Sequence, residues 1–180
     1  YPSYPESLAD LRQPPAQLFA IGDIELLRAP LVSIVGTRNA SPYGLRAARA
    51  IASSLARAGI GIVSGMARGI DAAAHRAALE AGGKTVAVLG TGIDVPYPAG
   101  HRDLHRLIGE QGLVVSESGP GTSAHKGSFP KRNRIIAALG RVTIVVEAGH
   151  HSGALNTASH ALGLDRRLAA VPGPLDSPAS

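Results

Sequence analysis

The sequence contains no cysteine and no tryptophan, and its aromatic residues are limited to four tyrosines and two phenylalanines. Without cysteine, the chain cannot form disulfides, hold zinc through thiolates or use a thiol as a nucleophile. With so few aromatic rings, its core must be built from alanine, valine, leucine and isoleucine. The lack of cysteine also fits the reducing cytoplasm, where we expect the protein to work.

Long hydrophobic runs are missing as well. No apolar stretch approaches the length needed to cross a bilayer, and the first residues do not have the pattern of a signal peptide. We therefore expect no membrane partner. A length of 180 residues is enough for one domain with a substantial core.

Charged residues are unevenly spread along the chain. Eighteen lysines and arginines against 13 acidic residues give a net charge of +5. Residues 26–70 and 118–146 hold 11 of the 18 basic residues and no acidic residue. If these two stretches meet in the fold, they form a positive face suited to phosphates. Scattered arginines such as Arg46, Arg49 and Arg57 fit an ordinary solvated helix surface better.

Short apolar runs alternate with helical segments along most of the chain. The predicted strands are 31–35, 61–63, 85–89, 113–116, 142–146 and 168–171. The predicted helices are 42–58, 71–81, 102–111, 130–139 and 155–162. This alternation predicts an α/β fold, with a doubly wound, mainly parallel, Rossmann-like sheet and helices on both faces.

The two ends of the chain do not follow this pattern. Residues 1–30 contain five prolines, with a short helix predicted over 16–21. We expect residues 1–30 to form an N-terminal extension that packs on the core. Residues 31–174 are expected to form the Rossmann-like domain, and residues 175–180 a loose tail.

Ligands of such sheets bind outside the carboxyl ends of the strands, near the point where the strand order reverses. The segments that follow the predicted strands are 36–41, 64–69, 90–98, 117–129 and 147–153. In the first, Gly36, Thr37 and Arg38 lead into a helix capped by Ser41. A phosphate site and a simple strand-to-helix turn explain these residues equally well. Neither a dinucleotide fingerprint nor a P-loop occurs.

The segment after the second predicted strand holds Ser64 and Gly65, followed by Asp71 and His75. Ser64, Asp71 and His75 are residue types found in hydrolases, but the nucleophile elbow G-x-S-x-G is absent. Asp71 more simply favours a helix N-terminus. We therefore expect no catalytic residues. Because the adjacent His150 and His151 diverge, we also expect no metal site, and nothing in the sequence calls for a cofactor.

The densest basic cluster follows the fourth predicted strand. Its four cations lie within nine residues: Lys126, Lys131, Arg132 and Arg134. Cations beside an aromatic ring suit single-stranded nucleic acid, because cations hold phosphates and a ring stacks on a base. Phe129 supplies that ring, unless it packs inward as the hydrophobic staple of the next helix. Gly127 and Ser128 add backbone and hydroxyl donors.

The segment after the fifth predicted strand offers a further anion site. Ser152 is the expected N-cap of the helix that follows, and its hydroxyl, with the backbone of Gly153, could face a phosphate.

Six sequence strings, in this order, resemble the DNA-processing protein A family, also called DprA or Smf. They are VGTRNASPYG (35–44), SGMARGIDAAAH (64–75), YP (97–98), SE (116–117), KGSFPKRNRII (126–136) and VVEAGHHSGALNTA (145–158). The resemblance runs from about residue 1 to 174. It implies a homodimeric, non-catalytic protein that binds single-stranded DNA, protects it during natural transformation and loads the RecA recombinase onto it.

The resemblance also implies where the DNA lies, in a positive pocket at the carboxyl ends of the strands. Arg38 corresponds to the arginine of the family's G-[ST]-R turn, and the KGSF and RNR strings correspond to further DNA contacts. Together with the strand-end segments, the expected DNA- or phosphate-binding set is Gly36, Thr37, Arg38, Ser64, Gly65, Lys126, Gly127, Ser128, Phe129, Arg132, Asn133, Arg134, Ser152 and Gly153.

Two alternatives remain at the level of the sequence. One is a nucleotide-binding sensor. The other is a nucleoside-monophosphate phosphoribohydrolase of the related lysine-decarboxylase-like group, whose signature is P-G-G-x-G-T-x-x-E. Here Gly119-Pro120-Gly121-Thr122 lacks the paired glycines, and His125 stands in place of the glutamate. This departure disfavours the hydrolase.

Overall fold

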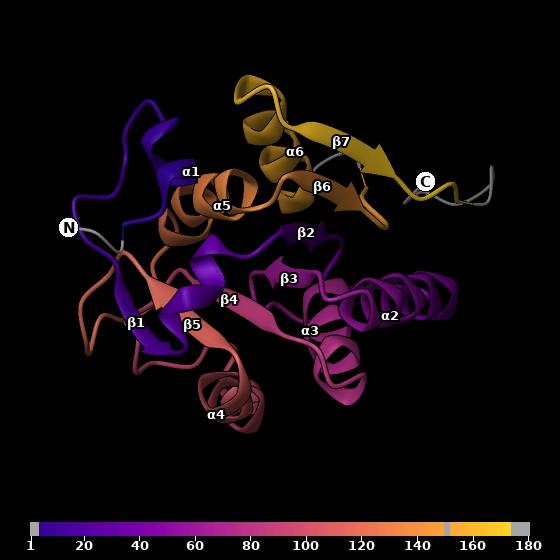
Figure 1. Ribbon diagram of the computed structural model, residues 1–180, viewed down its shortest axis with the longest axis horizontal. Helices are drawn as coiled ribbons and strands as arrows, with labels where there is room; N and C mark the ends of the chain where they lie inside the picture. The colour runs from indigo at the N-terminus through magenta and orange to yellow at the C-terminus, as the bar shows by residue number, and fades with distance from the viewer. Residues whose placement is uncertain (1–3, 150–151, 174–180) are drawn as a thin grey trace.

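One mostly parallel sheet forms the centre of the molecule (Figure 1). The computed structural model describes residues 4–149 and 152–173. Within them the strand order is β1-β5-β4-β3-β2-β6-β7, and only β1 runs antiparallel to its neighbour. The strands are β1 (Phe19–Gly22), β2 (Leu31–Val35), β3 (Gly61–Ser64), β4 (Thr85–Leu89), β5 (Leu113–Ser116), β6 (Val142–Val145) and β7 (Arg167–Ala170).

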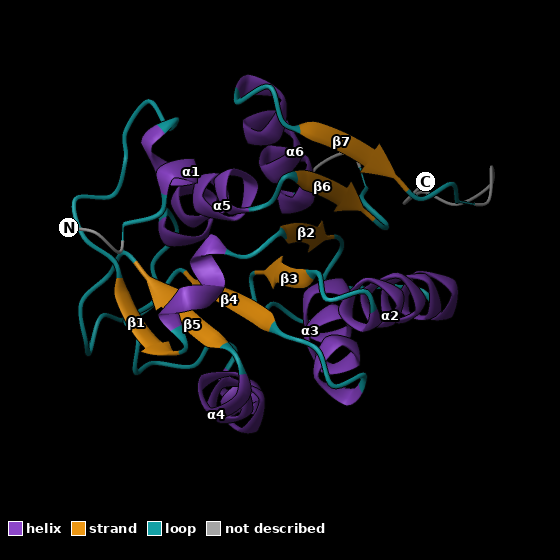
Figure 2. Ribbon diagram, viewed as in Figure 1, coloured by secondary structure: helices purple, strands orange, loops and turns teal. Residues whose placement is uncertain are grey.

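Helices cover both faces of this sheet (Figure 2). One face carries α2 (Pro42–Arg57), α3 (Ile70–Glu80) and α4 (Arg102–Gln111), and the other carries α1 (Glu6–Ala9), α5 (Ser128–Leu139) and α6 (Gly153–Gly163). Two 3-10 helices, η1 (Ile24–Arg28) and η2 (Ala99–His101), lie in the connections. The predicted doubly wound α/β class is therefore confirmed. None of the helices in the described residues is long and apolar enough to cross a bilayer.

The alternation of side chains along each strand divides the core between the two faces. In β2, Leu31 and Val35 pack with α5 and α6, whereas Val32 and Ile34 pack with α2 and α3. Every residue of β2, β3, β4 and β5 is buried. Strands buried on both faces favour apolar residues on both sides, which explains the nearly continuous apolar runs in the sequence. The hydroxyl-bearing residues of these strands each donate to a backbone carbonyl: Ser33, Ser64, Thr85 and Ser116.

The N-terminal segment differs from the prediction. Residues 16–21 were expected to be helical, but Phe19–Gly22 forms β1, which pairs with Leu113–Ser116. The sheet consequently has seven strands in the described residues rather than six. Without β1, the buried strand β5 would be left with an unpaired edge, and pairing with that edge outweighs local helix preference. Leu8 of α1 is buried against the α5 side of the core.

The strand order creates a crevice at one place. From β2 the chain moves through β3 and β4 to β5 on one side, and then returns to place β6 and β7 on the other side of β2. The loops that follow the carboxyl ends of β2 and β6 therefore lead away from each other, toward opposite faces of the sheet. This is the point at which doubly wound sheets bind ligands.

His75 is a buried part of the α3 packing. Its Nδ1 lies 2.7 Å from the Thr85 hydroxyl, which itself donates to the carbonyl oxygen of Ile62 at 2.9 Å. The hydroxyl proton is thereby used, so His75 must donate from Nδ1. Burial, together with the nearby charge of Arg132, lowers the pKa of His75 to about 3, so the side chain is neutral in the folded protein.

This neutral histidine predicts a pH-dependent stability. Between pH 6.5 and 3 the unfolded chain binds a proton at His75 that the folded chain does not, so lowering the pH destabilises the fold. We expect the stability advantage of the wild type over His75→Gln to shrink by about 2 kcal/mol between pH 7 and pH 5. Urea unfolding at the two pH values measures this difference. His125→Gln, in an exposed loop, is the control, and parallel pH profiles for wild type and His75→Gln would contradict the prediction.

Candidate functional site

Two adjoining cavities open at the carboxyl end of the sheet. The larger, of about 560 Å³, lies at the crevice between the ends of β2 and β6, beside the N-terminal ends of α5 and α6. The smaller, of about 390 Å³, lies over the loop after β3, beside Tyr97 and Pro98. Five residues line both cavities and form the wall between them: Arg38, Asn39, Ala67, Phe129 and Arg132.

The ring of Phe129, at the start of α5, is the centre of that wall. The Tyr97 ring lies 4.9 Å away between centroids, tilted by 39°. The guanidinium carbons of Arg38 and Arg132 lie 5.4 and 6.0 Å from the Phe129 centroid, within cation–π range. Gly90 leaves room for the ring, because a Cβ there would come within 3.0 Å of it. Phe129 is half-buried, so it both packs inward and reaches the cavities.

Arg132 is a buried cation whose hydrogen bonds go to the protein itself. Only 5% of the residue is exposed. Its Nη1 donates to the carbonyl oxygens of Gly65, at 2.7 Å, and Val88, and its Nε donates to Asn133 Oδ1 at 3.2 Å. Burial lowers the pKa of Arg132 to about 10, an effect opposed by the carboxylate of Asp71. The side chain therefore stays charged at neutral pH and ties α5 to the ends of β3 and β4.

Asp71 holds the loop between β3 and α3 from inside. Its Oδ2 accepts hydrogen bonds from the backbone amides of Gly65 at 3.1 Å and Ala67 at 3.3 Å. Burial raises the pKa of Asp71, and the Arg132 charge and these hydrogen bonds oppose the rise. The carboxylate thus acts on the shape of the loop rather than facing solvent.

The turn after β2 exposes Arg38 but not the amides of the next helix. Thr37 donates its N–H to the carbonyl of Glu147 at 2.6 Å, and the N–H of Ser41 donates to the Glu147 carboxylate at 2.9 Å. Ser41 Oγ caps α2 by accepting from the N–H of Gly44. The chain's own carboxylate therefore occupies the N-terminus of α2, and the exposed Arg38 side chain is what this turn offers to an anion.

The basic cluster of residues 126–134 is split by the geometry of α5. Lys126 and Gly127 are exposed ahead of the helix. Ser128 is buried, and its Oγ accepts from the N–H of His125 at 3.2 Å. Arg134 donates to both carboxylate oxygens of Glu117, at 2.9 and 3.0 Å, and lines neither cavity. Its expected contact with DNA stays a prediction.

Lys131 shares this acidic partner. Its Nζ lies 3.3 Å from Glu117 Oε2, and like Arg134 it lines neither cavity. Glu117 therefore faces two of the four cations of the sequence cluster.

The remaining expected residues meet around the larger cavity. Ser152 caps α6 by accepting from the N–H of Ala154 at 3.2 Å. Asn133 donates its amide to the carbonyl of Gly153 at 3.2 Å and to Asn156 Oδ1 at 3.1 Å. Gly36, Thr37, Asn133, Ser152 and Gly153 all line this cavity. Gly65 lines the smaller one.

Ser64, Asp71 and His75 do not form a catalytic triad. Ser64 Oγ donates to the carbonyl of Ile34 at 2.6 Å, and His75 bonds Thr85 instead. Each of these three side chains therefore has a hydrogen-bond partner elsewhere in the protein. Among the residues that the structure describes, no group of three or more acidic or histidine side chains could hold a metal. His150 and His151 lie outside the described residues.

Several cavity residues were not singled out from the sequence. Asn39, Arg68, Tyr97 and Asn156 all line one or both cavities. The YP string contains Tyr97, but nothing in its sequence neighbourhood indicates that its ring meets Phe129. Only the packing of the loop after β4 against α5 brings the two rings together.

The close packing of Arg132 on Gly65 yields a prediction. A Cβ at position 65 would lie 2.6 Å from Arg132 Cζ, and the guanidinium cannot move without breaking its carbonyl contacts. We expect Gly65→Ala to lower the free energy of unfolding by about 1–3 kcal/mol, as overpacking does. Urea unfolding measures this change. Gly100→Ala is the control because a Cβ there meets nothing within 4 Å. Equal stability of the two variants would refute the packing argument.

Comparisons with known proteins agree with this geometry. A family model described as DNA recombination-mediator protein A matches residues 1–180. The chain is 46% identical over 170 residues to DNA processing protein DprA of Streptococcus pneumoniae, covering 94% of this chain and 60% of that protein. It is 41% identical over 178 residues to Protein Smf of Escherichia coli, covering 98% of this chain and 48% of that protein. The chain thus spans about half the length of the curated relatives it matches.

Solved structures of DNA processing protein A also superpose closely on this chain. DNA processing protein A of Streptococcus pneumoniae superposes with a TM-score of 0.95 at 44% identity, covering 99% of this chain and 62% of that chain. The protein from Helicobacter pylori, described for its single-stranded DNA binding mode, superposes with a TM-score of 0.90 at 34% identity, covering 97% and 80%. A molybdenum cofactor binding protein from Rippkaea orientalis, at 20% identity, shares the fold alone, with a TM-score of 0.62 over 82% of this chain and 79% of that chain. The resemblance drawn from the six sequence strings is confirmed, and the chain belongs to the DprA/Smf family of DNA recombination-mediator proteins.

Proposed function

We propose that this chain binds single-stranded DNA across the wall between the two cavities, as a recombination mediator. The observation that carries the proposal is the grouping of the Phe129 and Tyr97 rings with the exposed Arg38 cation at the carboxyl edge of the sheet. A base can stack on an exposed ring while its phosphate meets the arginine. The binding mode described for the Helicobacter pylori relative supports the same ligand.

A single strand suits this site better than a duplex. The Phe129 ring stands between two concave compartments, so a base must leave its stack and its partner to reach it. The stacking surface is not base-specific, because every base has a π-face. We therefore infer a preference for unpaired strands and little direct reading of sequence by the rings.

The role that we infer for the bound strand is protection and transfer. In this proposal the chain shields incoming DNA and loads the RecA recombinase onto it in natural transformation, without catalysis. Its relatives are DNA processing proteins, which supports a role in handling DNA.

The proposal includes a homodimer. Within residues 4–149 and 152–173, β7 is an edge strand with all four residues exposed, and the apolar side chains of Leu155, Leu162 and Leu168 are exposed on α6 and β7. An open strand edge beside an apolar surface is a template for pairing with a second copy. The partner copy would extend the sheet at the end opposite β1.

Arg38 is expected to contribute one phosphate contact. Each neutralised phosphate on a single strand adds about −0.7 to the slope of log affinity against log salt. We expect Arg38→Ala to weaken binding of labelled oligo-dT and to make that slope shallower by about 0.7. Fluorescence anisotropy at several salt concentrations, with the equivalent duplex as a competitor, measures both quantities.

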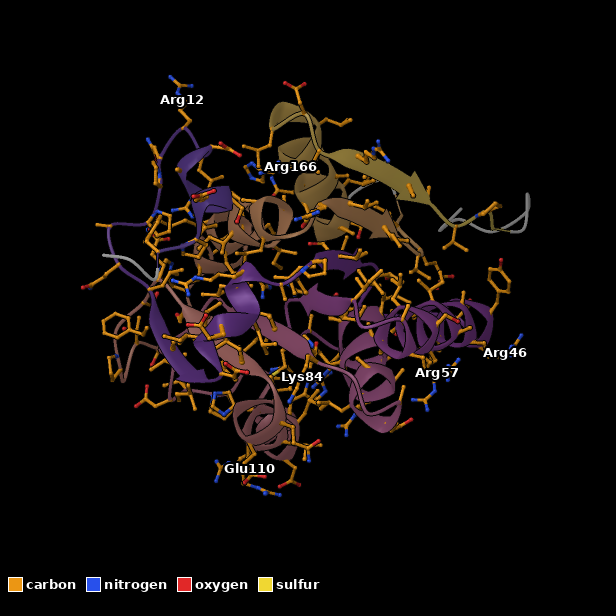
Figure 3. All side chains as sticks on the ribbon, in the orientation of Figure 1. Arg12, Arg46, Arg57, Lys84, Glu110 and Arg166 are labelled. Atoms are coloured by element: carbon orange, nitrogen blue, oxygen red, sulfur yellow. The ribbon has the colours of Figure 1, made fainter. Side chains whose placement is uncertain are left out.

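Arg46→Ala is the matched control for Arg38→Ala. Arg46 lies exposed on α2, on the outer side of the molecule, as Figure 3 shows. Its loss changes the net charge by the same amount but removes no cation from either cavity. Equal changes in slope for the two variants would mean that Arg38 acts only through net charge. No binding by the wild type at low salt would overturn the proposed function.

Phe129 should contribute to affinity in a different way. Phe129→Leu keeps an apolar side chain against Gly90 but removes the aromatic face. We expect it to weaken oligo-dT binding by about 1–3 kcal/mol, the usual contribution of base stacking, while leaving the salt slope unchanged. Anisotropy and a thermal melt together measure this. A lower melting temperature with unchanged affinity would assign Phe129 to packing alone.

A further inference from the structure

One hydrogen-bond donor in the larger cavity is oriented by a chain of buried and partly buried hydrogen bonds. Arg132 Nε donates to Asn133 Oδ1 at 3.2 Å. Asn133 Nδ2 then donates to Asn156 Oδ1 at 3.1 Å and to the carbonyl of Gly153 at 3.2 Å. The oxygen and the nitrogen of Asn133 are thus both engaged within the protein. Asn133 acts as a link that fixes the amide of Asn156.

This link decides what Asn156 can offer a ligand. Its carbonyl oxygen accepts from Asn133, so its amide hydrogens remain for another acceptor. Asn156 lies in the first turn of α6, is exposed, and lines the larger cavity. The cavity therefore has an aimed amide donor on the wall formed by α6.

The lining of the cavity favours a base over a phosphate at that wall. Its two cations, Arg38 and Arg132, lie beside the Phe129 ring. The rest of the lining includes the buried carboxylate of Asp71, apolar side chains such as Val35 and Ile136, and neutral polar groups such as Asn156. A volume of about 560 Å³ is in the range of small-ligand sites. Apolar side chains beside an oriented amide donor suit a flat heteroaromatic ring that carries an acceptor on its edge, whereas the Asp71 carboxylate disfavours a phosphate there.

We propose that Asn156 donates a hydrogen bond to the edge of an unpaired base that enters the larger cavity. The inference rests on the proposed single-stranded DNA function and adds to it a residue that senses the base rather than the backbone. Phe129 supplies a face that any base can use, whereas Asn156 requires an acceptor such as a pyrimidine carbonyl. The phosphate remains beside Arg38 on the wall between the cavities.

The test compares two strands of equal charge and shape. One is oligo-dT, and the other carries difluorotoluene in place of thymine, which keeps the ring but lacks strong hydrogen-bond acceptors. We expect Asn156→Ala to weaken oligo-dT binding roughly two- to tenfold, the range for one neutral hydrogen bond, with an unchanged salt slope. On the difluorotoluene strand, wild type and Asn156→Ala should bind equally.

Two further variants sharpen the comparison. Asn156→Asp keeps an acceptor for Asn133 but replaces the donor with a negative charge, so it should bind oligo-dT less well than Asn156→Ala does. Ser159→Ala is the control because Ser159 is exposed on the same helix and its hydroxyl donates to Leu155 of that helix. It should leave affinity for both strands unchanged. Thermal melts check that each variant is folded.

The possible outcomes test the Asn156 contact separately from the proposed binding of single-stranded DNA. Discrimination between the two strands by wild type, lost in Asn156→Ala, supports the contact. Wild-type binding to oligo-dT with no effect of Asn156→Ala overturns the inference and leaves the proposed function standing. An equal loss on both strands also overturns it, because Asn156 then acts through packing. Failure of the wild type to bind oligo-dT overturns the proposed function and this inference together.

Discussion

The buried guanidinium of Arg132 fixes helix α5, and with it the Phe129 ring, against the ends of β3 and β4. It joins the carbonyl oxygens of Gly65 and Val88, at the ends of two neighbouring parallel strands, to the first turns of α5. Carbonyl groups at the end of a strand have no ladder partners beyond it, so a planar cation with five donors is well suited to satisfy them. The cost of burying this charge is offset by those contacts and by the Asp71 carboxylate nearby.

The cations near the site therefore fall into two groups. Some bond the protein itself, and others are exposed to a ligand. Arg132 shapes the wall, and Arg134 holds Glu117. Arg38 is exposed beside the Phe129 ring, and Arg68 is exposed at the smaller cavity. Because the Glu147 carboxylate occupies the N-terminus of α2, the turn after β2 presents an anion with a side chain rather than with helix amides. Binding there should accordingly be sensitive to salt.

Under the proposed function, the two cavities would let one surface hold a strand without reading its sequence closely. The rings supply stacking that any base can use, and the arginine at the mouth supplies a charge that any phosphate can use. A single oriented amide on α6 would add a modest preference. Such a combination fits a protein that must accept many sequences and later release them, since neither contact demands a particular base.

Much of the fold could be read from the sequence. The short apolar runs predicted the six parallel strands β2 to β7, Ser41 and Ser152 were expected as helix caps and are caps, and the six strings indicated the family. The helix predicted over 16–21 was wrong because an edge strand is defined by its neighbour, and the sequence does not show that β5 needs a partner. Local propensity cannot indicate that β1 pairs with β5, because the two strands are about 95 residues apart in the sequence.

The site itself was only partly determined by the sequence. Residue type and spacing identified Arg38 and Phe129 as candidates, and the density of charge in residues 126–134 indicated an anion partner. Which of those cations is free depends on α5: successive residues of a helix point about 100° apart, so Arg132 turns into the core while Arg134 turns toward Glu117. The meeting of Tyr97 with Phe129, and the aim of Asn156, arise from loops and helices far apart in the chain. The charge pattern and the family motifs are set by the sequence alone. The tertiary structure determines which side chains can reach a ligand, because burial and hydrogen-bond partners arise only when the helices and strands pack together.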